Sequence, residues 1–357
     1  MKYILGVDTT FHSSGVGLID EKGNVLLNKK IDLDFDDQKD KKFFNFHNRN
    51  ILSLAKPILD KYGKDIFLIS ASCEDGPFHS MPVGAIVANS ISYLLNKNIV
   101  GVNHEIAHMH ANWLDRDEKD FSFPSISLNI SGAHSNIYLI KNLTEAEKIS
   151  EIIWRDDPEK FGGLGALFDE ICESLNIKIK KGGGGLCFEK LASLGKPKYK
   201  NKLEDFAIRE KNGNFFLGSM KSSILSALKS LGYFHLKGDV LEKFRKDFAA
   251  SLSEILFDSL IDAVAQAAKE TGAREIHLVG GVALDKALNS KMAFFCEENN
   301  FKYKFPLKPE YCRDNAAMTA ISGYFRWKYS NYDRDKKFLT IEPAKWYHKY
   351  YAKLYGK

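Results

Sequence analysis

The sequence predicts an α/β protein of two lobes, each built on a meander of three short strands. An apolar strand at residues 3–7, a polar turn and two further strands follow one another up to about residue 30. The same plan recurs at residues 125–152, where the first turn again carries hydroxyl groups and a glycine. Such a repeat indicates a duplicated lobe. Two such meanders, forming the walls of one cleft, are typical of the actin-like ATPase (ASKHA, duplicated RNase H-like) fold.

Length and composition agree with two lobes. The 357 residues, 44% hydrophobic and 27% charged, can bury one large core or two moderate ones. We expect an N-terminal lobe at residues 1–120, a C-terminal lobe with a helical insertion at 121–326, and a basic aromatic tail at 327–357. The five cysteines are scattered without a CxxC pair, and no apolar run reaches the length of a membrane span. We therefore expect a cytoplasmic protein with no membrane partner.

The segment between the two meanders alternates helix and strand. Apolar spacing predicts a helix at residues 41–61, a buried strand at 65–71 and a small-residue helix at 81–95. The entry to the last helix, residues 76–84, reads as a catalytic loop or as a turn with a proline at the first helical position, and we favour the turn.

A histidine pair follows the next strand, at residues 98–102. Asn103 is a suitable N-cap, and the helix that it starts carries His104 and His108 one turn apart on the same face. Two imidazoles at this spacing can bind a divalent ion if a carboxylate joins them, and Asp314 is the best later donor. A solvated or hydrogen-bonded helix face is the alternative reading.

The second half of the chain contains two glycine clusters ahead of helices. The run at 182–185 opens a predicted helix at 186–194, and it is either a hinge or a site for a phosphate or ribose, since it lacks the P-loop pattern. A long amphipathic helix is expected at about 240–271. The strand at 275–279 then delivers Gly280 and Gly281 to a helix start at about residue 282, where a ligand can approach the backbone.

The C-terminal segment carries the net charge of the protein. Residues 327–357 hold eight Lys or Arg against three Asp or Glu, and nine aromatic residues, while the whole chain has a formal charge of +5. Cations interleaved with aromatic rings are typical of contacts to single-stranded nucleic acid. A helix that packs its rings on the body and exposes its lysines fits equally well.

Five motifs in this order resemble those of the TsaD family, whose members make the N6-threonylcarbamoyl group on the tRNA adenosine beside the anticodon. The resemblance covers roughly residues 1–346. The motifs are IVGVNHEIAHMHA, ISGAHSNIYLI, FFLGSMKSSI, LVGGVALDKAL and YCRDNAAMTAISGY.

The resemblance implies a metal site and a nucleotide pocket. It implies that His104, His108 and Asp314 bind one divalent ion, iron or zinc with magnesium possible, and it assigns no catalytic residue beyond these ligands. The ligand set suits several metals. The nucleotide is threonylcarbamoyl-AMP, AMP or ATP, and the pocket is lined by Ser131, Gly132, Ala133, His134, Gly184, Gly185, Glu189, Gly280 and Gly281.

Three segments depart from the family pattern. Near the N-terminus, VDTTFHSS keeps Asp8 and Thr9 as candidate substrate residues but lacks two acids of the family string. FGGLGALFDE retains Gly165 and Asp169 and lacks the acids expected to meet the acyl group. Asp285 stands where the family has Asn. These departures lie in segments expected to meet the substrates, and they leave the identity of the acceptor open.

The resemblance implies transfer of threonylcarbamoyl from its adenylate to the N6 amine of a tRNA adenosine. Two other functions remain open: carbamoyl transfer to a small-molecule or nucleotide acceptor, and an inactive nucleotide-binding scaffold. Expected partners are tRNA and accessory proteins of a threonylcarbamoyladenosine-synthesis complex. In the tail, we expect RNA contacts from Lys345, Trp346, Tyr347, Lys349 and Lys353.

Overall fold

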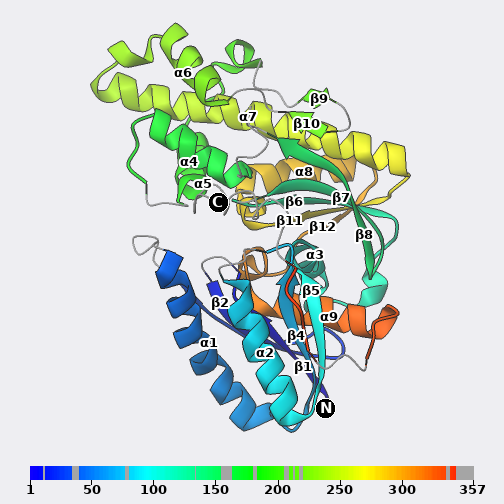
Figure 1. Cartoon of the computed structure of the whole chain (residues 1–357). Coiled ribbons are helices and arrows are strands. Elements are labelled where there is room, and N and C mark those ends of the chain that lie inside the picture. The colour runs from blue at the N-terminus through cyan, green and yellow to red at the C-terminus, as the bar shows by residue number, and fades with distance from the viewer. Residues whose placement is uncertain are drawn as a thin grey trace. The chain divides into compact units, whose positions relative to one another are not determined.

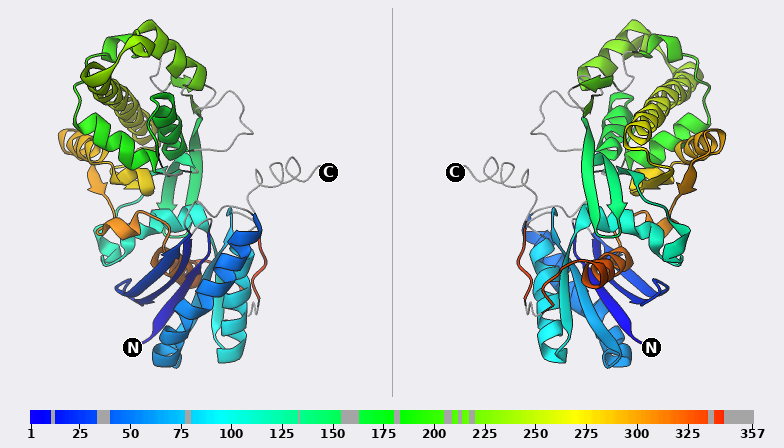
Figure 2. Two further views of the ribbon diagram at one scale, coloured as in Figure 1. Left: turned by 90° about the vertical axis from the view of Figure 1, so that its left-hand side faces the viewer. Right: turned by 90° about the vertical axis from the view of Figure 1, so that its right-hand side faces the viewer.

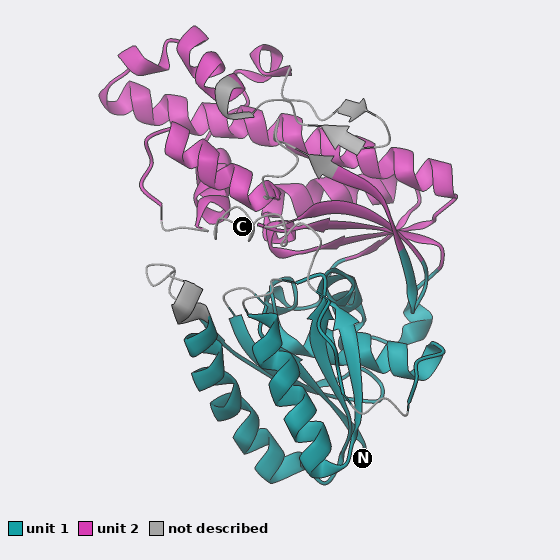
Figure 3. Cartoon of the chain, viewed as in Figure 1, with its two compact units in different colours: residues 1–122, 141–146, 305–357 teal, residues 123–140, 147–304 magenta. Residues whose placement is uncertain are grey.

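The chain forms two units, each organised around its own mixed sheet (Figure 3). Unit 1 comprises residues 1–122, 141–146 and 305–357, and unit 2 comprises residues 123–140 and 147–304. The computed structural model describes residues 1–10, 13–33, 40–76, 80–132, 134–153, 163–179, 183–204, 209–211, 214–216, 220–334 and 338–342.

The sheet of unit 1 has five strands in the order β3-β2-β1-β4-β5 (Figure 1). The predicted meander comprises β1 (Tyr3–Asp8), β2 (Ser13–Asp20) and β3 (Val25–Asp32), which pair antiparallel. β4 (Ile66–Glu74) and β5 (Asn98–Asn103) continue the sheet parallel to β1. The carboxyl ends of β1, β4 and β5 therefore meet at one edge.

Helices cover both faces of this sheet (Figure 2). Alternate residues such as Leu5 and Val16 share a core with α1 (Asp40–Tyr62) and α2 (Met81–Leu95). On the opposite face Gly17 lets the last long helix, α9 (Ala316–Tyr329), approach the strands closely, because a Cβ at Gly17 would lie 2.5 Å from the backbone nitrogen of Ala317. The shorter helices of unit 1 are α3 (His104–His110) and the 3-10 turns Ala111–Trp113, Glu118–Asp120 and Pro309–Tyr311.

This packing shifts one expected boundary. The sequence placed residues up to 326 in the second lobe, whereas residues from 305 onward belong to unit 1. The physical reason is α9, whose small residues fit against the glycines of β1 and β2. The meander is thus completed by a helix from the far end of the chain.

Unit 2 is built on a seven-stranded sheet in the order β12-β11-β6-β7-β8-β10-β9. β6 pairs antiparallel with β7 and parallel with β11, and every residue of β6 and β11 is buried. The strands are β6 (Ser125–Ile130), β7 (Ser135–Asn142), β8 (Glu145–Ile153), β9 (Arg209–Lys211), β10 (Asn214–Phe216), β11 (Glu275–Val279) and β12 (Lys302–Lys304).

The helices of unit 2 include the predicted long helix, which is confirmed as α7 (Gly238–Thr271), although its middle is buried on all sides and not on one face (Figure 1). The others are α4 (Leu164–Ser174), α5 (Gly184–Ser193), α6 (Met220–Ser230), α8 (Lys286–Glu298), and the 3-10 turns Lys200–Lys202, Tyr233–His235 and Gly281–Leu284. The helix start expected at residue 282 was wrong, because a 3-10 turn intervenes and α8 begins only after Asp285.

The last described residues, 338–342, run back along unit 1. Leu339 is buried in the core beside α2, and its backbone N–H donates to the side chain of Asn89 at 2.8 Å. Glu342 donates its backbone N–H to the carbonyl of Cys73 at 2.8 Å and forms a parallel bridge with Glu74 at the end of β4. None of the helices within the described ranges combines the length and apolar character needed to cross a bilayer.

Candidate metal centre and nucleotide site

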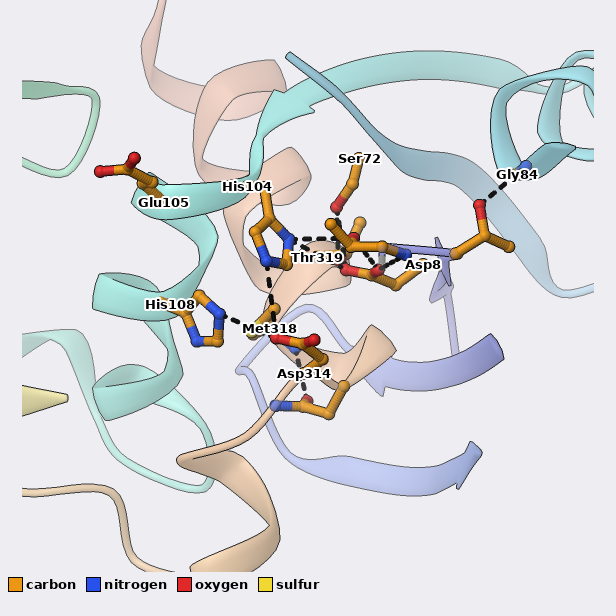
Figure 4. A network of polar contacts seen from close by, with 12 residues as sticks. Asp8, Ser72, Gly84, His104, Glu105, His108, Asp314, Met318 and Thr319 are labelled. Atoms are coloured by element: carbon orange, nitrogen blue, oxygen red, sulfur yellow. Dashed lines mark hydrogen bonds and ion pairs between the residues drawn. The ribbon is translucent and has the colours of Figure 1, made fainter. Parts of the chain in front are cut away.

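The helix α3 presents the two histidines of the predicted metal site. The side chain of Asn103 accepts hydrogen bonds from the backbone N–H groups of Glu105 and Ile106 at 2.9 and 3.2 Å, which confirms the expected N-cap. His104 and His108 follow on one face, with ring centroids 4.8 Å apart, and both are buried. Glu105 points away from them (Figure 4).

Asp314 meets both rings from the other end of the chain. Its Oδ1 lies 3.1 Å from Nε2 of His108 and 3.5 Å from Nε2 of His104 (Figure 4). Asn315 caps α9 by accepting the N–H of Met318 at 3.0 Å, and this cap fixes the residue before it. The three possible ligand atoms lie within 4.8 Å of one another. The structure therefore brings together the three residues that the sequence grouped.

A buried carboxylate lies behind His104. Asp8 ends β1, and its Oδ2 is 3.5 Å from Nδ1 of His104, while the hydroxyl of Thr10 lies 3.1 Å from the same nitrogen. The Asp8 carboxylate also accepts hydrogen bonds from Ser72 and Thr319 at 2.9 and 3.0 Å. A carboxylate on Nδ1 favours the proton there and orients the ring so that Nε2 faces Asp314.

The electrostatics of this cluster are strongly coupled. Burial lowers the pKa of His104, but its hydrogen bonds with Asp314 and Asp8 outweigh burial and raise that pKa to about 10. Burial likewise opposes the lowering of the Asp314 pKa, which the two histidines bring well below its usual range. The pKa of Asp8 is lowered by His104 against the effect of burial. The cluster is thus built to hold positive charge between two carboxylates.

The donor set fits a divalent metal ion. Two imidazole nitrogens and one carboxylate oxygen converge, and three protein ligands leave positions for a substrate, which is the arrangement of catalytic rather than structural sites. His104 has the supporting carboxylate that metal-bound histidines commonly have. The Nδ1 of His108 is buried and has no hydrogen-bond partner within the described ranges.

Thr9, the other candidate in the first turn, is engaged in local structure. Its hydroxyl donates to the carbonyl of Ser80 at 3.0 Å and accepts the N–H of Gly84 at 3.0 Å, so it joins the end of β1 to α2. Sequence reasoning missed Thr10, Ser72 and Thr319. A usable signal was available for Ser72, because it lies near the end of a strand parallel to β1 and β5.

In unit 2, the candidates in the first meander turn contact the start of α4. The N–H of Ser131 donates to the carbonyl of His134 at 2.8 Å, and the N–H of Gly165 donates to the carbonyl of Ser131 at 3.0 Å. Gly132 is exposed, and a Cβ added there would meet no atom within 4 Å. Its carbonyl accepts the N–H of Gly163 at 2.9 Å, so the open space lies only on the side to which a Cβ would point. Ala133 lies outside the described residues.

The glycines that open α5 contact α4 directly. The N–H of Gly184 donates to Oδ1 of Asp169 at 2.6 Å, and a side chain at this glycine would collide with Asp169. Gly185 follows in the first turn of α5. The sequence-predicted pair Asp169 and Gly184 thus forms one contact.

The remaining candidates lie at the carboxyl ends of β11 and β6. Gly280 has φ +95°, which favours glycine, and it packs against the backbone of Ile130. Gly281 is exposed with open space around its Cα. Because β6 and β11 are parallel neighbours, Gly280 lies at the same sheet edge as Ser131.

Two carboxylates cap the start of α8. Asp285 accepts the N–H groups of Ala287 and Leu288 at 2.9 and 3.2 Å, and Glu189 accepts that of Lys286 at 3.2 Å. Burial, with the negative charge of Glu189, raises the pKa of Asp285 to about 6 although the two backbone bonds lower it. This helix start suits hydroxyl donors such as those of ribose better than a phosphate.

The predicted RNA-contacting residues of the tail lie outside the described residues: Lys345, Trp346, Tyr347, Lys349 and Lys353. They stay predictions.

A sequence profile of the TsaD family, described as tRNA N6-adenosine threonylcarbamoyltransferase, matches residues 44–321. Three relatives carry that same description. The protein of Carboxydothermus hydrogenoformans is 29% identical over 93% of this chain and 94% of its own length. Those of Kosmotoga olearia and Thermosipho melanesiensis are 32% and 33% identical, covering 79% and 77% of this chain and 79% and 76% of their own.

Among solved structures, full-length HypF in a phosphate- and nucleotide-bound form is similar with a TM-score of 0.59 at 13% identity. The similarity covers 91% of this chain but only 46% of HypF, so the chain spans about half of that protein. This likeness concerns the fold alone and confirms the predicted actin-like ATPase architecture. From the profile and the relatives, the chain belongs to the TsaD family of tRNA N6-adenosine threonylcarbamoyltransferases.

Proposed function

We propose that the protein transfers a threonylcarbamoyl group from threonylcarbamoyl-adenylate to the N6 amine of the tRNA adenosine beside the anticodon. The observation that carries the proposal is the cluster of His104, His108 and Asp314, formed by two motifs within or beside the stretch that matches the family. A scaffold subunit has no need of this donor set, so the cluster disfavours the inactive alternative.

The residues of the metal centre have separate tasks in this proposal. When bound, a divalent ion supplies a Lewis acid that polarises the carbamoyl carbonyl of the donor. His104, His108 and Asp314 would hold it, and Asp8 would orient the His104 ring through Nδ1. Iron and zinc both suit two imidazoles and a carboxylate, and magnesium suits them less.

The glycine-lined edge of unit 2 is the proposed seat of the adenylate. Gly132 and Gly281 are exposed, and a Cβ at either would meet no atom within 4 Å, so a phosphate can come close to the chain on that side. Glu189 and Asp285 supply acceptors for ribose hydroxyls at the start of α8. The reaction then joins N6 of the adenosine to the carbamoyl carbon and releases AMP.

A second candidate is carbamoyl transfer to another acceptor, from carbamoyl phosphate and ATP. It is favoured by the segment at 161–170, in which the acids expected to meet the acyl group are absent. Leu164 and Leu167 are buried there, and the N–H of Leu164 donates to the hydroxyl of Ser135 at 2.9 Å. Nothing acidic in this short stretch precedes Asp169.

One experiment separates the candidates. The protein is incubated with labelled threonine, bicarbonate, ATP, an adenylate-forming enzyme and an unmodified tRNA transcript, and in parallel with labelled carbamoyl phosphate, ATP and small acceptors. We expect label in the tRNA from threonine, and none in a transcript with guanosine in place of the acceptor adenosine. A His108→Ala variant should lose both metal and transfer. Label entering only the small acceptors from carbamoyl phosphate would replace the first proposal with the second.

We further propose that the tail contacts the acceptor tRNA. Glu342 forms a parallel bridge with Glu74 at the end of β4. Glu74 in turn pairs with Asn103 of β5, the residue before His104. The tail therefore begins at the sheet edge that carries the proposed metal ligands.

Truncation after Glu342 keeps the contacts of residues 338–342 and removes four lysines. It should weaken tRNA binding and flatten the slope of log affinity against log salt by up to about 3. Unchanged salt dependence would leave the tail as a packing element only. Accessory proteins of a synthesis complex remain expected partners.

A further inference from the structure

A lysine-lined pocket lies in unit 2, on residues that the metal centre and nucleotide candidates do not use. Its volume is about 430 Å³, and it is lined by Lys196, Pro197, Lys198, Lys243 and Asp247. Lys243 and Asp247 lie on α7, and the other three lie on the loop after α5 (Figure 1). Lys196, Lys198 and Lys243 are all exposed.

The loop that carries two of these lysines is fixed to α7. The carboxylate of Asp247, which is 5% exposed, accepts the backbone N–H of Lys196 at 2.9 Å. The hydroxyl of Ser251, one turn further on, accepts the backbone N–H of Tyr199 at 2.9 Å. Gly195 lies so close to the backbone of Lys246 that no side chain fits there. The lysines therefore project from a backbone held at three points.

The charges in this pocket are not neutralised. Within the described ranges, no ion pair involves Lys196, Lys198 or Lys243, and the only carboxylate of the lining, Asp247, is occupied by a backbone N–H. Lys200, in the same loop, differs: its Nζ lies 2.8 Å from Asp258 on α7. The lining thus carries three cations against one engaged carboxylate, and this excess of positive charge favours anions.

We propose that this pocket binds phosphate groups in the backbone of the acceptor RNA, as a contact separate from the reacting adenosine. The proposal rests on the proposed function, which makes RNA the acceptor. Lysine ammonium groups are flexible point charges that suit phosphate oxygens without selecting a base.

The lining favours RNA over two other anions. A free nucleotide needs a surface for its base, but the ring of Tyr199 packs against Phe244 with centroids 5.0 Å apart, and no aromatic residue lines the pocket. An acidic protein surface needs an apolar core to its interface, and Pro197 is the one apolar residue of the lining. A sugar-phosphate backbone needs only the cations.

The test compares two triple variants of equal charge. K196Q/K198Q/K243Q removes the pocket cations, and K148Q/K200Q/K269Q removes three lysines that do not line it, including Lys200 of the same loop. Binding of an unmodified tRNA transcript is measured from 50 to 300 mM salt. Each lost phosphate contact should reduce the slope of log affinity against log salt by about 0.7 to 0.9, so the pocket variant should lose roughly 2 to 3 and bind about tenfold or more weakly.

The controls keep two failures distinct. If the wild-type protein transfers label to tRNA but both variants bind tRNA alike, the pocket proposal is overturned and the proposed function stands. If the wild type transfers no label to tRNA, the proposed function fails first. A second measurement needs no variant: chemical acetylation of the wild type should be slowed by tRNA at Lys196, Lys198 and Lys243 and not at Lys269. Equal protection of all four, or protection by an acidic protein but not by tRNA, also refutes the proposal.

Discussion

Replacing Asp8 with Asn tests whether a buried carboxylate supports His104 as the proposed metal ligand. The substitution keeps the shape of the side chain and removes its charge. Asp8 now accepts hydrogen bonds from Ser72 and Thr319 and lies 3.5 Å from Nδ1 of His104. Oδ2 of Asp8 serves these three contacts, and Oδ1 accepts the backbone N–H of Thr10 at 2.8 Å. An amide has a single acceptor oxygen and no charge, so the substitution removes the negative charge beside His104 Nδ1 and one of these two sets of hydrogen bonds.

The size of the effect follows from the type of contact. Removing the partner of a metal-bound histidine typically costs 10- to 100-fold in metal affinity, or about 1.4 to 2.7 kcal/mol. We therefore expect the Asp8→Asn protein to bind zinc or iron(II) about 10- to 100-fold more weakly while keeping its fold. The matched control is Asp32→Asn, which removes an exposed carboxylate from β3 of the same sheet, where it pairs with Lys30 at 3.1 Å. Its metal affinity should not change.

The assay is competition with a chromogenic chelator at fixed pH, on protein shown by circular dichroism to be folded. If folded Asp8→Asn protein binds metal within about twofold of the wild type, the supporting role of Asp8 is wrong. In that case its contacts with Ser72 and Thr319 serve only to join β1, β4 and α9.

Three further predictions concern pH and packing. The pKa of His104 is raised to about 10 by Asp314 and Asp8 against burial. The stabilising contribution of protonated His104 to the metal-free protein is therefore full below about pH 6.5 and is lost as the pH rises through 10. Melting temperatures measured with a chelator should fall over this pH range, and an unchanged melting temperature contradicts the pairing. Gly17→Ala should destabilise the protein by about 1–3 kcal/mol and lower its metal content, because the new Cβ meets α9, the helix that begins just after Asp314. The control Gly132→Ala should be tolerated, because a Cβ there meets no atom within 4 Å. Equal denaturation midpoints for the two variants refute this prediction. The raised pKa of Asp285, about 6, costs stability as the pH rises from about 4 to 6. The Asp285→Asn protein should therefore gain stability relative to the wild type across that pH range. The same difference in urea midpoint between variant and wild type at about pH 4 and at about pH 6 would exclude this prediction.

Much of the candidate metal site was predictable because its signals are local. The N-cap of Asn103 and the spacing of His104 and His108 are written in one short stretch, and the structure reproduces them. The prediction that Asp314 is the third ligand depended on the family resemblance as well as on its position before a helix. The segment shortly ahead of Asp314 is a 3-10 turn, Pro309–Tyr311. Short turns of this kind leave no periodic pattern to detect.

The tertiary partners of the site were not predictable in the same way. Asp8 was expected to meet substrate, yet its carboxylate is buried behind His104. That position depends on β4 inserting between β1 and β5, which is a matter of strand order and not of local pattern. The same holds for α9: its small residues predict a close approach, but only the glycines opposite, such as Gly17, identify the partner.

The distance along the chain between His108 and Asp314, two of the candidate metal ligands, has a consequence for how the protein is made. Asp314 follows His108 by 206 positions in the sequence, and all of unit 2 lies between these two residues. Closing a loop of that length costs about 5 kcal/mol of chain entropy, which the packing of α9 and any bound ion must offset together. On the ribosome, β1 and β2 emerge early, but the face whose glycines contact α9 stays uncovered until nearly the whole chain has been translated. Unit 2 can therefore fold first, and unit 1, with its candidate metal site, is the last part of the protein to be completed.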